Sequence, residues 1–155
     1  MEKKHTSTAK GATEDSGVKG KRALVMGLGL HGGGVATAKW LAKRGAVVTA
    51  TDLRSGEVLA ASVKALAKTS TTFVLGEHRP ADFESHDLIV ANPGVPRESK
   101  FLAIAKKAGK RIENDASLFF ASNTHPVLAV TGTRGKTTTT LLLDSTRVPP
   151  IGGTP

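Results

Sequence analysis

Arg22-Ala-Leu-Val-Met-Gly-Leu-Gly-Leu-His-Gly32 decides the fold of this chain, because a short apolar run leads directly into glycines at G-x-G-x-x-G spacing. The run predicts a buried strand, and Gly27, Gly29 and Gly32 predict a tight turn into a helix. Apolar residues at helical spacing follow over 35–44, and a second strand over 46–51 ends at Asp52. This order is the mononucleotide-binding βαβ unit and predicts a nucleotide or dinucleotide phosphate site at the turn. The alternative is that the glycines serve only the packing of helix on strand.

The rest of the chain continues the alternation of strands and helices. It therefore predicts an α/β fold, with a Rossmann-like parallel sheet and helices on both of its faces. The further elements expected are a helix over about 56–68, a strand over 71–75, a strand over 87–92 that ends in a proline turn, a helix over about 97–108, an edge strand over 111–113 and a short helix over 116–121.

A second glycine loop lies in Val127-Leu-Ala-Val-Thr-Gly-Thr-Arg-Gly-Lys-Thr-Thr-Thr-Thr140. The stretch predicts a strand, a phosphate-binding loop and a helix, which is the start of a P-loop domain. Lys136 can reach the β- and γ-phosphates of a nucleoside triphosphate, and Thr137 can place its hydroxyl on Mg²⁺. Val130 stands where the usual pattern has its first glycine, so the loop is a shorter G-x-x-G-K-T. The alternative is an ordinary glycine turn capped by threonines.

Composition narrows the function classes. The chain has 155 residues and no cysteine, which excludes disulfides and thiolate chemistry and suits a reducing, cytoplasmic setting. No apolar run approaches a membrane span, and the N-terminus has no hydrophobic signal core. The net charge is +9, but the basic residues are scattered over separate elements without interleaved aromatic residues. We therefore expect no nucleic-acid partner and no membrane partner.

Three segments are expected along the chain. Residues 1–20 read as a basic, disordered tail, residues 21–123 as the Rossmann-like domain, and residues 124–155 as the truncated start of a P-loop domain. The last helix can run only to about Arg147, because Pro149 and Pro150 stop it.

Five motifs together resemble the Mur ligases of peptidoglycan synthesis, over about 21–143. They are Gly27-Leu-Gly-Leu-His-Gly32, Thr51-Asp-Leu-Arg54, Asn92-Pro-Gly-Val-Pro96, Asn114-Asp-Ala-Ser-Leu-Phe-Phe120 and Thr131-Gly-Thr-Arg-Gly-Lys-Thr-Thr138. Within the family, the likeness is greatest to the members that join D-glutamate to UDP-N-acetylmuramoyl-L-alanine. The resemblance implies that the first domain holds the UDP part of that substrate and that the central domain binds ATP.

Site residues follow from the resemblance by position. The UDP-substrate site would consist of Gly27, Gly29, Leu30, His31, Gly32, Asp52, Leu53, Arg54, Asn92 and Gly94. The ATP phosphates would lie on Gly132, Thr133, Arg134, Gly135, Lys136, Thr137 and Thr138, with Lys136 and Thr137 as catalytic residues and Thr137 on Mg²⁺. The implied chemistry is phosphorylation of the alanyl carboxylate by ATP to an acyl phosphate, followed by attack of the D-glutamate amine.

The chain also departs from the family. Arg134 stands where the family usually has asparagine, His31 replaces a small hydroxyl residue, and Asn92 replaces a serine. Most of the central domain and the amino-acid-binding C-terminal domain do not follow, so we expect the chain alone to be inactive. The alternative function is an NAD(H)-binding dehydrogenase or regulatory module, because Asp52 stands where such proteins have a ribose-binding acid.

Overall fold

The computed structural model describes residues 17–145. The chain divides between Thr124 and His125 into two compact units, which are described separately. None of the helices in the described part of the chain combines the length and the apolar character that crossing a membrane requires.

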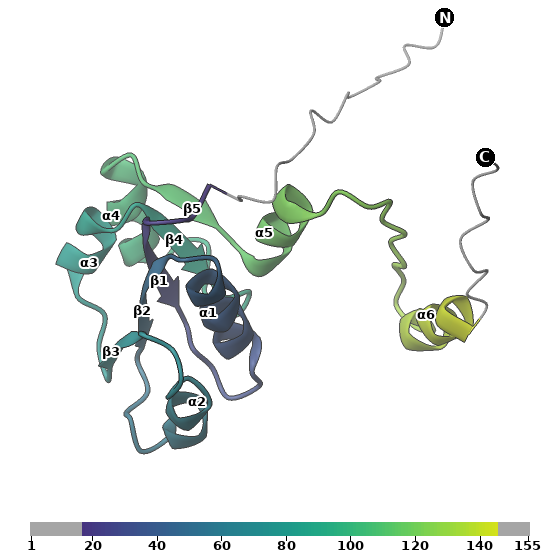
Figure 1. Ribbon diagram of the computed structural model, residues 1–155, viewed down its shortest axis with the longest axis horizontal. Coiled ribbons are helices and arrows are strands. Elements are labelled where there is room, and N and C mark those ends of the chain that lie inside the picture. The colour runs from purple at the N-terminus through teal and green to yellow at the C-terminus, as the bar shows by residue number, and fades with distance from the viewer. Residues whose placement is uncertain (1–16, 146–155) are drawn as a thin grey trace, which may run out of the picture. The chain divides into compact units, whose positions relative to one another are not determined.

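The first unit is built on a five-stranded parallel sheet in the order β3-β2-β1-β4-β5 (Figure 1). Its strands are β1 (Arg22–Met26), β2 (Val47–Asp52), β3 (Thr72–Leu75), β4 (Leu88–Ala91) and β5 (Arg111–Glu113). Its helices are α1 (Gly33–Lys43), α2 (Ala60–Ala65), α3 (Pro80–Ser85), α4 (Lys100–Lys107) and α5 (Asp115–Ser122). The chain leaves β1 in one direction for β2 and β3 and returns on the other side for β4 and β5. The switch point of this Rossmann-like sheet therefore lies between β1 and β4.

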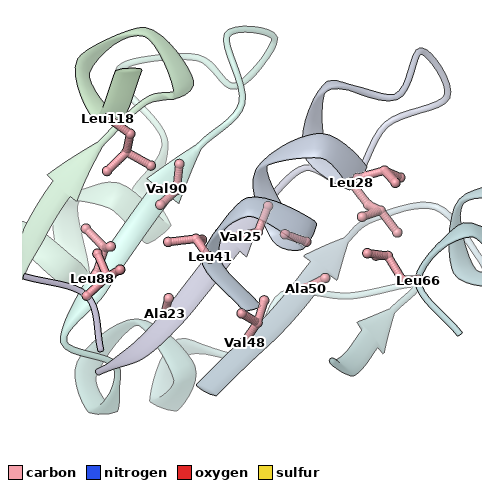
Figure 2. Close-up of a cluster of buried hydrophobic side chains, with 13 residues drawn as sticks. Ala23, Val25, Leu28, Leu41, Val48, Ala50, Leu66, Leu88, Val90 and Leu118 are labelled. Carbon is pink, nitrogen blue, oxygen red and sulfur yellow. The ribbon is translucent and has the colours of Figure 1, made fainter. Parts of the chain in front are cut away.

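Helices cover both faces of the sheet, as predicted, because successive strand residues point to opposite sides. Ala23 and Val25 of β1 lie in one core cluster with Leu41 of α1 and Leu118 of α5. Figure 2 shows this cluster, with the side chains of β1, β2 and β4 grouped around Leu41. The alternate β1 residues, Leu24 and Met26, pack on the opposite face in a second cluster. That second cluster also contains Phe83 of α3, Ile89 of β4 and Ala105 of α4.

The predicted elements differ from the observed ones mainly at the helices. The helix expected over 56–68 is helical only over 60–65, with turns on either side. The helix expected from 97 begins at Lys100, because residues 97–98 continue the turn that follows the proline-rich segment. Helix α3 was not expected, although Pro80 in its first turn is a common helix-start signal. Its Phe83 is fully buried.

The N-terminal boundary also differs from the prediction. Val18, which was assigned to the disordered tail, is 1% exposed and belongs to the first core cluster. The Gly20 N–H donates to the Gly45 carbonyl at 2.8 Å, which ties this segment to the turn before β2. The part of the predicted tail before residue 17 lies outside the described residues.

The second unit contains one helix in its described residues, α6 (Lys136–Ser145). The strand predicted over 127–130 is wrong, because these residues form no strand. A strand needs a partner for its backbone hydrogen bonds, and the described part of this unit contains no other extended segment to pair with. Val127 and Leu128 are accordingly 46% and 74% exposed. The predicted end of the helix near Arg147 lies outside the described residues.

Candidate functional site

A cleft of about 950 Å³ lies at the carboxyl ends of the strands, at the switch point of the sheet. This is the position at which open parallel sheets bind ligands. The cleft is lined by the turn after β1, the residues after β2, the proline turn after β4 and the start of α4. All the predicted UDP-site residues except Gly32 line it: Gly27, Gly29, Leu30, His31, Asp52, Leu53, Arg54, Asn92 and Gly94.

The glycine turn after β1 is shaped by contacts with its neighbours. Gly27 has φ of +89°, and a Cβ there would lie 3.0 Å from the Cβ of Asn92 on the neighbouring strand end. Gly34 is tighter still, since a Cβ would come within 2.5 Å of the Gly27 and Leu28 carbonyl oxygens. Gly32 precedes α1 as its N-cap. Close packing of α1 on the turn therefore depends on Gly34, a residue outside the G-x-G-x-x-G pattern.

The start of α1 presents backbone donors at the turn. The Ala36 N–H donates to the Gly32 carbonyl at 2.8 Å. The N–H groups that precede Ala36 in the first helical turn have no carbonyl of this helix to bond. Such donors and the helix dipole favour an anion such as a phosphate. The turn is also held from α2, because the Ser62 hydroxyl donates to the Gly29 carbonyl at 2.9 Å.

Asp52 is buried at the end of β2 and is held by three donors. It accepts from the Gly29 N–H at 3.0 Å, from the Arg54 N–H at 2.9 Å and from the Arg54 guanidinium at 3.4 Å. Burial by itself would raise the pKa of Asp52, but these hydrogen bonds and the Arg54 charge outweigh it and hold the pKa below its ordinary value. Asp52 is therefore ionised, and its carboxylate links the turn after β1 to the backbone that follows β2.

The cleft lining also contains residues that the sequence did not mark. It includes His78 from the segment between β3 and α3, together with Lys100 and Phe101 from the start of α4. The Phe101 ring stacks on Phe83 with centroids 5.2 Å apart, and His78 meets it edge-on at 5.0 Å. His78 could have been found, because it follows the end of a predicted strand and all parallel strands end at this edge. Phe101 has no such signal, since it reads as an ordinary core position of a helix.

Asp115 also lines the cleft and was not predicted. It is the first residue of α5, behind an Asn114 N-cap whose side chain accepts from the Ser117 N–H at 2.8 Å. In return the Asn114 N–H donates to the Ser117 hydroxyl at 2.9 Å, completing a capping box. This cap fixes where α5 begins.

The predicted ATP loop lies in the second unit, immediately before α6. Gly135 has φ of +80°, which favours glycine, and the Lys136 ammonium donates to the Gly132 carbonyl. The whole loop over 131–138 is exposed. The Thr137 hydroxyl makes no hydrogen bond within the described residues, so its chemistry fits the Mg²⁺ ligand that the motif predicts. Residues 17–145 hold no group of three or more His, Asp or Glu side chains that could hold a metal ion.

A family model described as the N-terminal domain of MurD-like Mur ligases matches residues 21–114, well over half of the chain. The chain belongs to the MurD-like Mur ligases. It is 56% identical over 124 residues to a UDP-N-acetylmuramoylalanine–D-glutamate ligase of Roseiflexus, covering 80% of this chain and 27% of that protein. A ligase with the same name from Borreliella burgdorferi is 48% identical over 128 residues, covering 81% of this chain and 28% of that protein. This Mur ligase chain thus spans about a quarter of the length of its relatives.

The fold of this Mur ligase chain also has a counterpart among solved structures. A pseudomurein peptide ligase type C from Methanothermus fervidus superposes with a TM-score of 0.51 at 24% identity. The superposition covers 80% of this chain and 25% of that structure. The likeness supports the Rossmann-like architecture.

Proposed function

We propose that this chain contains the UDP-substrate-binding part of an ATP-dependent ligase that joins D-glutamate to UDP-N-acetylmuramoyl-L-alanine in peptidoglycan synthesis. The observation that carries the proposal is the cleft at the switch point, lined by the residues that the family motifs mark. Its position at strand ends next to a helix N-terminus suits a nucleotide diphosphate. Residues 21–123 would form this binding domain, and residues 124–155 would begin the ATP-binding domain.

Within the cleft, each wall would have its own role. The donors at the start of α1 would bind the diphosphate, aided by the positive charges of Arg54 and Lys100. Asp52 would act indirectly, since its carboxylate holds the Gly29 and Arg54 backbone in place. Asn92 accepts from the Gly94 N–H at 3.0 Å and would keep the proline turn in the shape that closes the cleft.

The second unit would supply the phosphate loop for ATP. Lys136 would exchange the Gly132 carbonyl for the ATP phosphates, while Gly132, Thr133, Arg134, Gly135 and Thr138 would surround them. Thr137 would contact Mg²⁺, which neutralises phosphate charge when it is bound. The resulting acyl phosphate would react with the D-glutamate amine. Because ATP and nucleotide-linked sugars are made inside the cell, we place this reaction in the cytoplasm.

The runner-up function, an NAD(H)-binding module, rests on the position of Asp52. In such a module the acid would bind the ribose hydroxyls. Here the Asp52 carboxylate already accepts hydrogen bonds from Gly29 and Arg54, which disfavours that role. A second phosphate loop is also unnecessary for a dinucleotide module.

Calorimetric titration of the 155-residue chain with UDP-N-acetylmuramoyl-L-alanine, UDP and NADH tests the proposal. We expect both uridine nucleotides to bind in preference to NADH. Arg54→Ala should weaken uridine-nucleotide binding by at least about tenfold, the loss of one charge-assisted contact. The matched control is Arg79→Ala, which also removes an arginine paired with an aspartate but does not line the cleft. Tight NADH binding without uridine-nucleotide binding would favour the dehydrogenase alternative.

A further inference from the structure

His78 has an unusual set of contacts for a side chain on the wall of a ligand cleft. Its ring is half-buried and lies edge-on to Phe83 at 5.9 Å and to Phe101 at 5.0 Å. Its Nδ1 lies 2.8 Å from the hydroxyl of Thr51, a fully buried residue of β2. No hydrogen bond to its Nε2 is found within residues 17–145. Nδ1 is therefore held by Thr51, whereas Nε2 has no hydrogen-bond partner among the described residues and belongs to a side chain that lines the cleft.

The Thr51 hydroxyl determines which nitrogen carries the proton. This hydroxyl donates to the Glu77 backbone carbonyl at 3.1 Å, and a carbonyl can only accept. Because a hydroxyl has one hydrogen, its 2.8 Å contact with His78 must then be donated by the ring Nδ1. The opposite arrangement would leave two oxygen acceptors 3.1 Å apart with no hydrogen between them. These two hydrogen bonds, from His78 Nδ1 to the Thr51 hydroxyl and from that hydroxyl to the Glu77 carbonyl, thus favour the Nδ1–H tautomer of His78.

In that tautomer, Nε2 of a neutral imidazole is a pure acceptor. Burial of the ring lowers the pKa of His78, although the Asp52 carboxylate pulls it the other way, so the neutral form is favoured. A bare acceptor would repel a phosphate, which offers only oxygens at neutral pH. It would instead attract an N–H group of the ligand.

We propose that His78 accepts the ring N3–H of the uracil base and thereby selects uridine over cytidine nucleotides, with Thr51 as the positioning residue that sets its tautomer. The inference rests on the proposed function. The cleft lining also includes apolar residues that suit a flat base, namely Met26, Val95, Pro96 and Phe101. At the position of the uracil N3–H, cytosine carries an unprotonated acceptor nitrogen, so two acceptors would face one another across the cleft.

The experiment measures calorimetric affinities of the 155-residue chain for UDP, CDP and N3-methyl-UDP. The wild-type chain should prefer UDP over the other two by about tenfold or more, the usual scale for one hydrogen bond with a mismatched alternative. His78→Ala should reduce both preferences to less than about twofold. Thr51→Val keeps the size of the side chain and should also reduce the preference for UDP over CDP. Thr72→Val is the matched control because Thr72 is an exposed residue of β3, and it should leave the preference for UDP over CDP unchanged.

Long-range ¹H–¹⁵N correlation spectra of the His78 ring provide a readout that a merely structural role of Thr51 would not move. The wild-type ring should show the Nδ1–H tautomer, and Thr51→Val should shift it toward Nε2–H. An Nε2–H tautomer in the wild type, or equal UDP preferences in wild type and His78→Ala, would overturn the inference while the proposed function stands. Failure of UDP to bind at all would overturn both.

Discussion

Gly34, the second residue of α1, has the tightest steric constraint against the turn after β1. An added Cβ would lie 2.5 Å from two backbone carbonyl oxygens, and backbone cannot move aside as a flexible side chain can. We therefore expect Gly34→Ala to lower the free energy of unfolding by about 2–3 kcal/mol, the scale of overpacking in a well-packed site. Urea denaturation measures this.

The neighbouring residue offers a matched control. A Cβ at Gly33 would lie 3.7 Å from the Asn92 side chain, an ordinary contact. Gly33→Ala should change the free energy of unfolding by less than about 0.5 kcal/mol. Equal losses for the two variants would show that the close approach at Gly34 is not what limits this position.

Asp52 makes the stability of the first unit depend on pH in acid. Its pKa in the folded chain is lowered, so the stability that it contributes is fully present above its unfolded pKa of about 3.9 and is lost as the pH falls through the folded value. Asp87 and Glu113 also have lowered pKa values and act in the same direction. Asp52→Asn should therefore reduce the slope of unfolding free energy against pH below about pH 4. An unchanged slope, measured by denaturation at several pH values, would show that the ionised Asp52 carboxylate does not stabilise the folded chain.

At the scale of elements, α3 is attached to the sheet through a buried histidine. The His86 Nδ1 lies 2.6 Å from the Asp82 carbonyl, which can only accept, so Nδ1 carries the proton. In a neutral ring, Nε2 then accepts from the Thr49 hydroxyl of β2 at 3.0 Å. His86 therefore closes the end of α3 and joins it to a central strand.

Removing the Thr49 hydroxyl tests this attachment. Thr49→Val keeps the shape of the residue but leaves the buried Nε2 without its donor, so we expect a loss of about 1–2 kcal/mol in unfolding free energy. Thr72→Val is again the control, with a change of less than about 0.5 kcal/mol because its side chain is exposed. Chemical denaturation of the two variants measures their free energies of unfolding. Equal losses for Thr49→Val and Thr72→Val would contradict the attachment of α3 through His86.

At the scale of the whole molecule, the ATP loop should bind its nucleotide weakly. Lys136 and the start of α6 can hold a phosphate locally, but the loop is exposed and the segment before it pairs with no strand in the described second unit. We expect a dissociation constant above about 10 μM for Mg-ATP. Calorimetry with wild type and Lys136→Ala measures it, and tighter binding that depends on Lys136 would disprove this expectation.

Ligation by these 155 residues alone should also be undetectable. The acyl-phosphate step requires the γ-phosphate and the alanyl carboxylate to lie about 3–3.5 Å apart. The proposed UDP cleft would provide affinity for the substrate without stabilising that transition state. Phosphate release from ATP, with UDP-N-acetylmuramoyl-L-alanine and D-glutamate present, is the assay. Turnover that needs both substrates and is abolished by Lys136→Ala would show the expectation to be wrong.

The sequence by itself determined the elements whose signals are local. The apolar run before Gly27, the helical spacing after it and the strand ending at Asp52 each depend on neighbouring residues, so the βαβ unit and the parallel sheet were predictable. The candidate residues of the first domain came instead from the family resemblance. The second loop shows the limit of such signals. An apolar run over 127–130 reads as a strand, but a strand exists only when a partner accepts its hydrogen bonds.

Tertiary structure alone decided which residues face one another across the chain. His78 and Phe101 became cleft residues because β3 and β4 end at the same edge of the sheet, although they are separated in sequence. Only glycine fits at position 34 without strain, because α1 closely approaches the turn after β1. The spacing of residues in the sequence does not predict that close approach. The tautomer of His78 likewise depends on Thr51, a buried residue of another strand. Periodicity reports what each residue prefers locally, whereas contacts between distant segments arise only when the sheet is assembled.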